Sequence, residues 1–396
     1  MTAAAFQSAR TIADAVLMEG YALYPYRASA PKNRFRWTFG VLAPRAWSEA
    51  GGCEPWWLEA QLLVAGDPTL VRGLLRGFQV ERRRVFDASG HEVAGLDDGV
   101  TLEVAWDEGR LREVAFELGD HVATFDACED SAAHAGGRVV TTRRPLEIQV
   151  STRLDRIEAA PSLWQLSIRV ANTTPWRDLD APRDAAVAAG LVSTHLILAV
   201  PDGTLISAID PPEWAMAAAS RCTNTATYPV LVGDDVMLCA PFAMYDHPRI
   251  APESAGDLCD ATEIDELLVL RARTLTDAEK REARATDPRA RAIVDRAENL
   301  ADTQLARMHG ATRDLAGGEM VPKVAVGSKV RLRAASRRTD AQDLLYAGRL
   351  ATIAEIKRDI DGSLFLAVTI DDDPAAELHD WYGRYHHYRI EEVEPL

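Results

Sequence analysis

The chain has 396 residues, of which 47% are hydrophobic and 26% are charged, and its formal net charge is −16. This composition supports packed cores in two or three domains and excludes wholesale disorder. The excess of acidic residues argues against unspecific nucleic-acid binding and against docking on anionic membranes, which both need clustered cations. No apolar run approaches the ~20 residues of a membrane-spanning helix. Residues 1–6 lack the basic and apolar regions of a secretory signal, so we expect a cytoplasmic protein.

The N-terminal part predicts a short helix followed by strands. Apolar residues between Phe6 and Met18 recur near helical spacing, and Gly20 follows them. Beyond this point, apolar runs separated by turn clusters predict strands at residues 36–42, 56–64, 78–86, 101–106 and 112–118. We therefore expect a β-rich domain over residues 1–145 that begins with a short helix.

The central part predicts a sheet with one buried face. In residues 146–154 and 164–170, apolar side chains alternate with polar ones, and a short polar connection joins the two runs. Residues 195–200 and 205–209 flank Pro201-Asp202-Gly203, which has the composition of a hairpin turn. This pattern predicts a β-sandwich-like domain over residues 146–275.

Helical signals come next and end at a linker. Thr276 and Glu279 have the spacing of a capping box, and Asp287-Pro288 places proline directly after a capping residue. These signals predict a helical segment over residues 276–310. Residues 310–322 show no apolar period and predict a linker. The four runs beyond it, 329–333, 349–357, 364–370 and 388–393, predict an SH3-like small barrel over residues 323–396, and the fold class is mainly β or α+β.

No pattern in the sequence identifies a catalytic centre. Glycine-rich nucleotide-binding loops, the HExxH zinc motif and the GxSxG nucleophile motif are all missing. The five cysteines contain no CxxC pair, which argues against a zinc ribbon or an iron–sulfur ligand set and favours reduced, mostly buried thiols. We therefore assign no catalytic residue and no cofactor.

Two clusters of residues contain side chains of the kinds that bind metal ions. His379, His386 and His387 lie near the acidic run 371–373, but adjacent histidines on a strand face opposite sides and do not easily share one ion. Five carboxylates crowd residues 257–266, yet the spacing and the central glycine of a calcium loop are missing. Surface histidines and a polar loop are the simpler interpretations, and the acidic loop remains a candidate partner surface.

A second candidate partner surface interleaves aromatic and cationic residues between positions 21 and 37. A packed aromatic edge with protruding arginines explains this pattern without a partner. The alternative is a recognition surface for another protein, because Tyr, Trp and Arg dominate binding hot spots. The predicted partner-binding residues on the two surfaces are Tyr24, Tyr26, Arg27, Trp37, Asp257, Glu263 and Asp265.

Two long stretches of the sequence resemble a known family of proteins. The first covers residues 15–29, 32–33 and 36–41, and the second covers 241–254, 256–258, 262–266 and 275–277. Both resemble uncharacterised proteins that are encoded beside high-affinity, oxygen-tolerant nickel–iron hydrogenases, and residues 326–333 and 371–374 fit as well. The chain departs from that pattern at Cys259 and Ala261, where an aromatic residue and a glycine are expected. The resemblance implies a shared pathway and transfers no catalytic residue.

Two hypotheses follow from these observations. The first is an accessory or assembly protein that binds a hydrogenase subunit or a maturation factor by protein–protein contact. The second is an enzyme or metal carrier of the same pathway that uses the acidic loop or the C-terminal histidines. A concave site with convergent ionisable groups would favour the second hypothesis over the first.

Overall fold

The computed structural model is mainly β with a smaller helical part, as the sequence predicts. It separates into two compact units, Met1–Gly310 and Ala311–Leu396. The structure describes residues 3–18, 26–34, 36–134, 136–157, 162–233, 235–250, 262–308, 325–333, 346, 348–358, 364–373, 385–389 and 392–395. No helix in this described part of the chain is long and apolar enough to cross a membrane.

The first unit contains eight α-helices and fifteen strands among its described residues. The helices are α1 (Ala3–Ala13), α2 (Arg45–Glu49), α3 (Arg183–Val187), α4 (Glu213–Ala219), α5 (Thr262–Arg273), α6 (Asp277–Thr286), α7 (Pro288–Asn299) and α8 (Asp302–Met308). The strands are β1 (Trp57–Gly66), β2 (Arg72–Asp87), β3 (Glu92–Val93), β4 (Gly95–Asp97), β5 (Leu102–Val104), β6 (Trp106–Phe116), β7 (Gly119–Phe125), β8 (Cys128–His134), β9 (Gly137–Arg143), β10 (Leu146–Arg156), β11 (Leu163–Asn172), β12 (Leu191–Ala199), β13 (Gly203–Leu205), β14 (Tyr228–Gly233) and β15 (Val236–Ala240).

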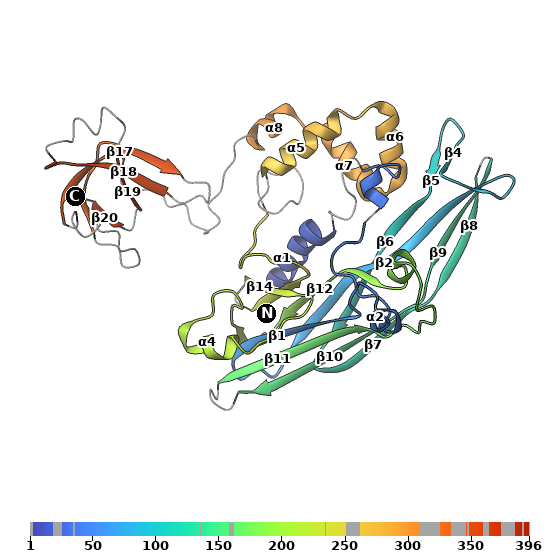
Figure 1. Cartoon of the computed structure of the whole chain (residues 1–396), viewed down its shortest axis with the longest axis horizontal. Coiled ribbons are helices and arrows are strands. Elements are labelled where there is room, and N and C mark those ends of the chain that lie inside the picture. Colours follow the sequence, from blue (N-terminus) through green and yellow to red (C-terminus); the bar gives the residue numbers. More distant parts are fainter. Residues whose placement is uncertain are drawn as a thin grey trace. The chain divides into compact units, whose positions relative to one another are not determined.

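Two antiparallel sheets form the body of this unit (Figure 1). One has the strand order β13-β1-β11-β10-β7, and the other has the order β14-β15-β12-β2-β9-β8, with β3 and β6 also paired to β2. A single cluster of buried side chains draws on both sheets, including Leu62 and Ile168 from the first and Leu75 and Leu198 from the second. The alternation predicted for β10 and β11 is confirmed, because their apolar residues enter this core.

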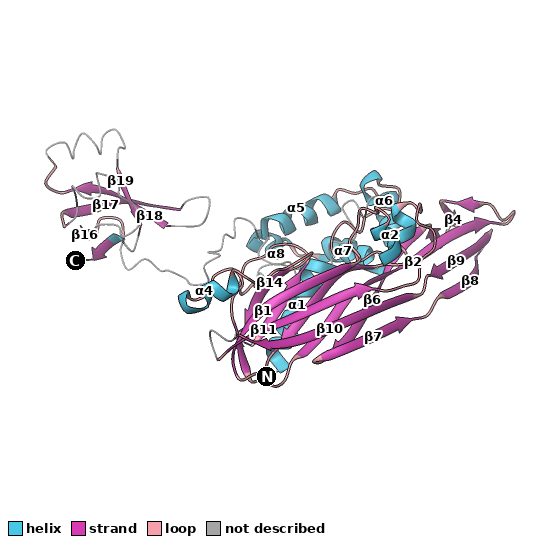
Figure 2. Cartoon of the chain, turned by 60° about the horizontal axis from the view of Figure 1, so that its bottom comes forward, coloured by secondary structure: helices cyan, strands magenta, loops and turns pink. Residues whose placement is uncertain are grey.

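Helix α1 covers the other face of the larger sheet (Figure 2). Ile12 and Leu17 pack with Leu74 and Ile197 in a second buried cluster. All nine residues of β12 are buried, because apolar layers cover both faces of this strand. The predicted N-terminal helix is therefore an integral layer of the first unit.

Strand β2 is 16 residues long and passes from the body into a projecting arm. Residues 72–79 pair with β12, and residues 81–87 pair with β9 on the same side. Strand β6 runs along the opposite edge of β2 from residue 73 to residue 83. Strands β4, β5, β8 and β9 lie toward the far end of this arm in Figure 1.

The caps of the helical segment form as predicted. Thr276 and Glu279 make the reciprocal bonds of a capping box at the start of α6. The Asp287 carboxylate accepts a hydrogen bond from the Arg289 amide, and Pro288 occupies the first position of α7. Helix α5 also forms over residues that the sequence assigned to the acidic loop and to the end of the β-sandwich-like domain, because Val269 and Ala272 are buried against α7.

Three other expectations from the sequence differ from the structure. Residues 36–42 form no strand beyond a single bridge between Leu42 and Leu191. Residues 201–203 close no hairpin, because β12 pairs with β2 and β15, whereas β13 pairs with β1 in the other sheet. The domain boundary expected at residue 145 falls within one body, because β1 pairs with β11 and β2 pairs with β12 across it.

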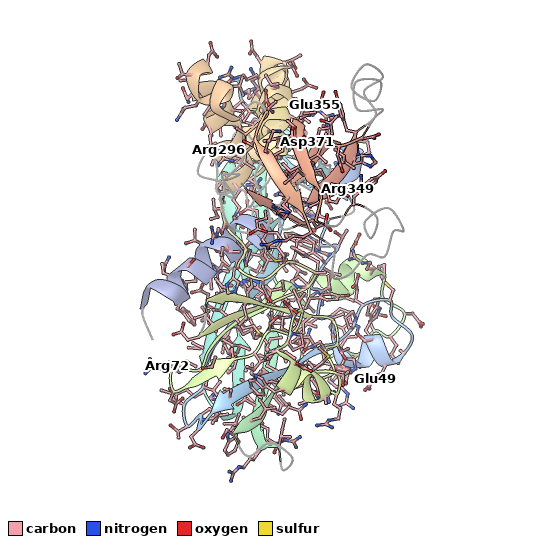
Figure 3. The ribbon with its side chains drawn as sticks, turned by 90° about the vertical axis from the view of Figure 1, so that its left-hand side faces the viewer. Glu49, Arg72, Arg296, Arg349, Glu355 and Asp371 are labelled. Atoms are coloured by element: carbon pink, nitrogen blue, oxygen red, sulfur yellow. The ribbon has the colours of Figure 1, made fainter. Side chains whose placement is uncertain are left out.

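The second unit contains one five-stranded antiparallel sheet among its described residues. Its strands are β16 (Lys329–Leu332), β17 (Leu350–Arg358), β18 (Leu364–Ile370), β19 (His386–Arg389) and β20 (Val393–Pro395), in the order β19-β18-β17-β16-β20. Val330, Ile353 and Leu366 contribute to its buried cluster. Asp371 and Arg349, labelled in Figure 3, make ion pairs with Lys329 and Asp372, respectively. The SH3-like closure of this sheet stays a prediction.

Candidate functional site

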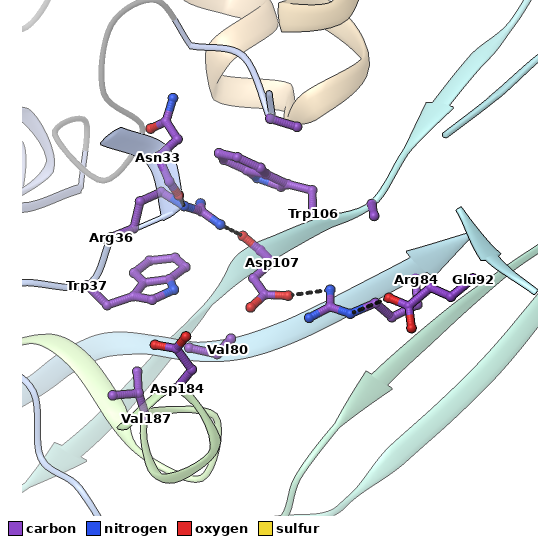
Figure 4. A pocket seen from close by; sticks show the side chains of 12 residues that line it. Asn33, Arg36, Trp37, Val80, Arg84, Glu92, Trp106, Asp107, Asp184 and Val187 are labelled. Carbon is purple, nitrogen blue, oxygen red and sulfur yellow. Dashed lines mark hydrogen bonds and ion pairs between the residues drawn. The ribbon is translucent and has the colours of Figure 1, made fainter. Parts of the chain in front are cut away.

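A pocket of about 370 Å³ lies where three separate parts of the first unit meet (Figure 4). Its lining residues come from the segment that follows α1, from strands β2, β3 and β6, and from α3. The charged and aromatic side chains that line it are Arg36, Trp37, Arg84, Glu92, Trp106, Asp107 and Asp184. Its size falls in the range of ligand-binding pockets in proteins.

The guanidinium of Arg36 lies between two tryptophan rings. Its central carbon is 3.4 Å from the ring centroid of Trp106 and 4.8 Å from that of Trp37. Nη2 of Arg36 donates a hydrogen bond to the Asp107 carbonyl at 2.7 Å, and Nε donates one to the Asn33 carbonyl at 3.2 Å. Burial lowers the pKa of Arg36 to about 10, against the opposing effect of nearby carboxylates, so the side chain stays cationic at neutral pH.

Trp37 adopts a backbone conformation that bulky residues rarely occupy. Its φ is +61°, in the left-handed region that favours glycine. Such a conformation costs on the order of 1–3 kcal/mol and persists only where the surroundings enforce it. Here Arg183 Nη2 donates to the Trp37 carbonyl at 2.5 Å, and the indole ring packs on Phe78 with 6.5 Å between ring centroids. The tryptophan is thereby held half-buried at the pocket.

The carboxylates of the pocket differ in how far they are already neutralised. Asp107 accepts a bond from Arg84 Nη1 at 2.7 Å, and Glu92 lies 3.4 Å from Arg84 Nε (Figure 4). The Asp184 side chain is 77% exposed and lies 4.0 Å from Arg183. Asp184 is therefore the carboxylate most accessible to a ligand. The tryptophan rings already stack with Arg36, so the exposed carboxylate of Asp184 is what suits a basic group, by ion pairing.

Strand β6 connects the pocket to the helical segment. The Trp106 indole Nε1–H donates to the carboxylate of Asp287 at 3.4 Å. Burial raises the pKa of this carboxyl, although it also caps α7. Arg83, on β2, donates to the carbonyls of Ala285 and Thr286 at the end of α6. Hydrogen bonds from Trp106 and Arg83 thus link the strands at the pocket to α6 and α7.

The structure places the other predicted N-terminal residues in an internal contact. Tyr26 is only 4% exposed and packs against Ala283 and Val294, and it too has a positive φ of 62°. Arg27 makes an ion pair with Glu279 at 3.0 Å. These two side chains attach the segment to α6 and α7 and are not exposed anchors. Tyr24 lies outside the described residues.

The acidic surface is described only in part. Asp257 lies outside the described residues. Glu263 and Asp265 belong to α5, although the structure does not describe their side chains. The same helix exposes Leu267 by 54% and Leu270 by 39%, which are three residues apart and so share one face. Residues 262–266 of the predicted acidic loop therefore belong to a helix, and the two exposed leucines follow them on that helix.

The histidine candidates do not form a site among the residues that are described. His386 and His387 are adjacent in β19, and the His386 ring lies 4.9 Å from the Tyr346 ring. His379 falls outside the described residues. Within the described ranges, no group of three or more His, Cys, Asp or Glu is placed to hold a metal ion.

Sequence reasoning identified Trp37 but missed the residues that complete its pocket. Trp106, Asp107 and Asp184 come from β6 and α3, about 70 and 150 positions away, and carry no local signal that links them to the segment around Arg36. In comparisons with known proteins, no family model matches this chain, and no curated protein matches it either.

Proposed function

We propose that this protein is a cytoplasmic accessory or assembly factor that acts by protein–protein contact in nickel–iron hydrogenase maturation. Its partner would be a hydrogenase subunit or another maturation factor. The pathway part of this proposal rests on the resemblance of the phrases in residues 15–41 and 241–277 to proteins encoded beside hydrogenases. The contact part has separate support from the pocket at Trp37.

The observation that supports contact most directly is the strained tryptophan. Trp37 occupies a conformation that favours glycine, yet it presents an indole at a pocket that also contains the exposed carboxylate of Asp184. Strained residues of this kind cluster at functional sites. Tryptophan is also among the commonest hot-spot residues in protein interfaces. A lysine or arginine side chain of a partner would pair with Asp184, and Trp37 would add apolar contact area beside it.

Helix α5 supplies a second surface for the same role. Leu267 and Leu270 lie on one exposed face of a helix whose first turn contains Glu263 and Asp265. An apolar pair at this spacing, flanked by carboxylates, fits recognition of a helix in a groove. The proposal therefore includes Glu263 and Asp265, which belong to this helix.

Deleting the gene in a cell that produces the hydrogenase tests the pathway. We expect less assembled, active enzyme, because the immature subunit would lose a binding partner. Normal hydrogenase activity in the deletion strain, under conditions where the hydrogenase is expressed, would contradict the proposal. Stoichiometric nickel in the purified protein, lost in His386→Ala with His387→Ala, would instead favour the metal-carrier alternative.

Capture of purified hydrogenase subunits and maturation factors tests the surfaces. Trp37→Ala should weaken capture by tenfold or more, at about 2 kcal/mol for a hot-spot residue. Asp184→Asn and the pair Leu267→Ser with Leu270→Ser should weaken it as well. Val122→Ser is the matched control, since Val122 is 64% exposed on β7, outside both surfaces. Equal capture by all variants would rule out these surfaces without ruling out the pathway.

A further inference from the structure

The outer face of the smaller sheet carries a second pocket, separate from the one at Trp37. It has a volume of about 350 Å³. Gln149 lies opposite Ala171, and Ser151 lies opposite Arg169, in the register of β10 and β11. The residues that alternate with these, such as Val150 and Val170, are buried in the core, so these four side chains face outward. Arg45, Trp56 and Thr173 complete the lining.

Two arginines and one tryptophan define the chemistry of this pocket. The Arg45 guanidinium lies 4.6 Å from the ring centroid of Trp56, and that of Arg169 lies 5.4 Å from the same ring. Arg169 also lies 4.3 Å from the ring of Trp57, whereas Arg45 pairs with Glu49 at 2.8 Å. Stacking on aromatic faces orients a guanidinium and leaves the N–H groups at its edge to donate in the ring plane.

The neutral members of the lining add hydrogen-bond donors. Gln149 has an amide and Ser151 has a hydroxyl group, whereas the hydroxyl of Thr173 already donates to Glu147. Among the described residues that line the pocket there are two cations and no carboxylate, in a chain whose formal charge is −16. Three carboxylates lie beside the pocket without lining it. Glu49 pairs with Arg45, and Glu147 accepts from Thr173 Oγ1 at 2.7 Å. Glu59 lies opposite Arg169 in the register of β1 and β11 and accepts from Gln61 Nε2 at 2.9 Å, so Arg169 is the lining cation that makes no ion pair within 4.0 Å among the described residues.

We infer that this pocket binds the oxyanion group of a small ligand, a carboxylate or a phosphate. Arg169 supplies the principal charge, because guanidinium groups recognise both kinds of oxyanion by paired hydrogen bonds. Gln149 and Ser151 lie beside it on the same sheet face and donate to the remaining oxygens. The pocket is independent of the proposed partner contact, because none of its lining residues belongs to the Trp37 pocket or to α5.

Isothermal titration calorimetry of the full chain tests this inference. Inorganic phosphate and glutarate serve as the two probes, with chloride at matched ionic strength as the blank. We expect saturable binding of at least one probe with a Kd of roughly 1 mM or below. Saturation by phosphate alone identifies a phosphate ligand, and saturation by glutarate alone identifies a carboxylate. Absence of saturable binding for both probes would overturn the inference.

Variants distinguish ligand binding in this pocket from a nonspecific effect of net charge on binding. Arg169→Gln should weaken binding by about tenfold or more, since it removes a charge-assisted hydrogen bond. Arg153→Gln is the matched control, because Arg153 also faces outward on β10, is 76% exposed and pairs with Asp155 outside the pocket. Gln149→Ala should weaken binding without any change of charge. An equal loss in Arg169→Gln and Arg153→Gln, or no loss in Arg169→Gln, would overturn the inference. Thermal unfolding of each variant checks that the fold is retained.

Discussion

Arg76 on β2 and His195 on β12 lie directly opposite each other in the larger sheet, and both side chains are buried. Arg76 is neutralised by Asp14 at 2.6 Å and by Glu113 at 2.8 Å. The ring nitrogen Nδ1 of His195 lies 2.7 Å from the Ser193 carbonyl, beside an irregularity in the strand pairing. This polar pair thus lies on the face of the larger sheet that α1 and the residues after it cover. The stability of the first unit therefore depends on the protonation state of His195.

The first prediction concerns pH. Burial, with a further contribution from the charge of Arg76, lowers the pKa of His195 to about 3, whereas an unfolded histidine titrates near 6.5. The neutral, buried His195 therefore contributes fully to the free energy of unfolding above about pH 6.5. This contribution declines as the pH falls toward 3, because the unfolded chain then binds a proton that the folded chain does not. The slope from this residue is about 1.4 kcal/mol per pH unit within that window.

Urea unfolding at several pH values measures this slope. His195→Gln should flatten the loss of stability below about pH 6.5 relative to the wild type. His91→Gln is the control, because the His91 side chain is 81% exposed. If the wild type and His195→Gln lost stability equally on acidification, His195 would not be the buried neutral histidine described here.

The second prediction separates a buried ion pair from an exposed one. Arg76 and Arg10 both pair with Glu113 at 2.8 Å, but their side chains are 2% and 33% exposed. Arg76→Leu should lower the free energy of unfolding by ~3 kcal/mol, because it removes the buried cation that joins Asp14 and Glu113 and leaves only Arg10 beside Glu113. Arg10→Leu should cost less than ~1 kcal/mol. Chemical denaturation measures the free energy of unfolding of the two variants. Similar losses of stability in both would contradict the difference in burial between Arg76 and Arg10.

The third prediction concerns the attachment of the helices to the arm. Arg83 donates to Ala285 and Thr286 at the end of α6, to the Val104 carbonyl, and pairs with Glu108 at 3.0 Å. Arg83→Met should therefore speed amide hydrogen exchange in α6 and α7 while leaving β10 and β11 protected. Arg110→Met is the control, with a side chain 58% exposed on the same arm. Unchanged exchange in α6 and α7 would show that other contacts hold them.

The fourth prediction concerns close packing at Gly73. A Cβ atom there would lie 2.1 Å from the ring of Phe116 on the neighbouring strand β6. Gly73→Ala should therefore destabilise the first unit by ~1–3 kcal/mol, as overpacking does. Adding Phe116→Leu should recover part of the loss, since it shortens the clashing side chain. Thermal unfolding of the two single variants and the double variant gives the coupling, and strictly additive losses would contradict the contact.

Sequence alone determined the features that depend on neighbouring residues. The alternation in residues 146–154 and 164–170 identified β10 and β11 and their buried faces, because side chains on a strand point to opposite sides in turn. Thr276 and Asp287 marked the starts of α6 and α7, because a cap bonds to amides only two or three residues away. The residues that form these bonds are all visible in a short window of sequence.

Only part of the candidate site could be predicted from the sequence. The mixture of aromatic and cationic residues drew attention to Tyr26 and Trp37, but the same composition suits an internal contact and an exposed surface. Tertiary packing sent Tyr26 into the interface with α6 and α7 and held Trp37 at a pocket. No periodicity distinguishes these two outcomes.

Long-range pairing decided the rest. The sequence predicts that β12 and β13 form a hairpin. In the structure, β12 pairs with β2 and β15 and is buried on both faces, whereas β13 pairs with β1 in the other sheet. Arg36 meets Trp106 across 70 positions of chain. Local propensity determines which segments extend or coil, whereas burial of apolar faces over the whole first unit determines which segments meet. The pocket at Trp37 is a product of the second process, and so is the pocket at Arg169.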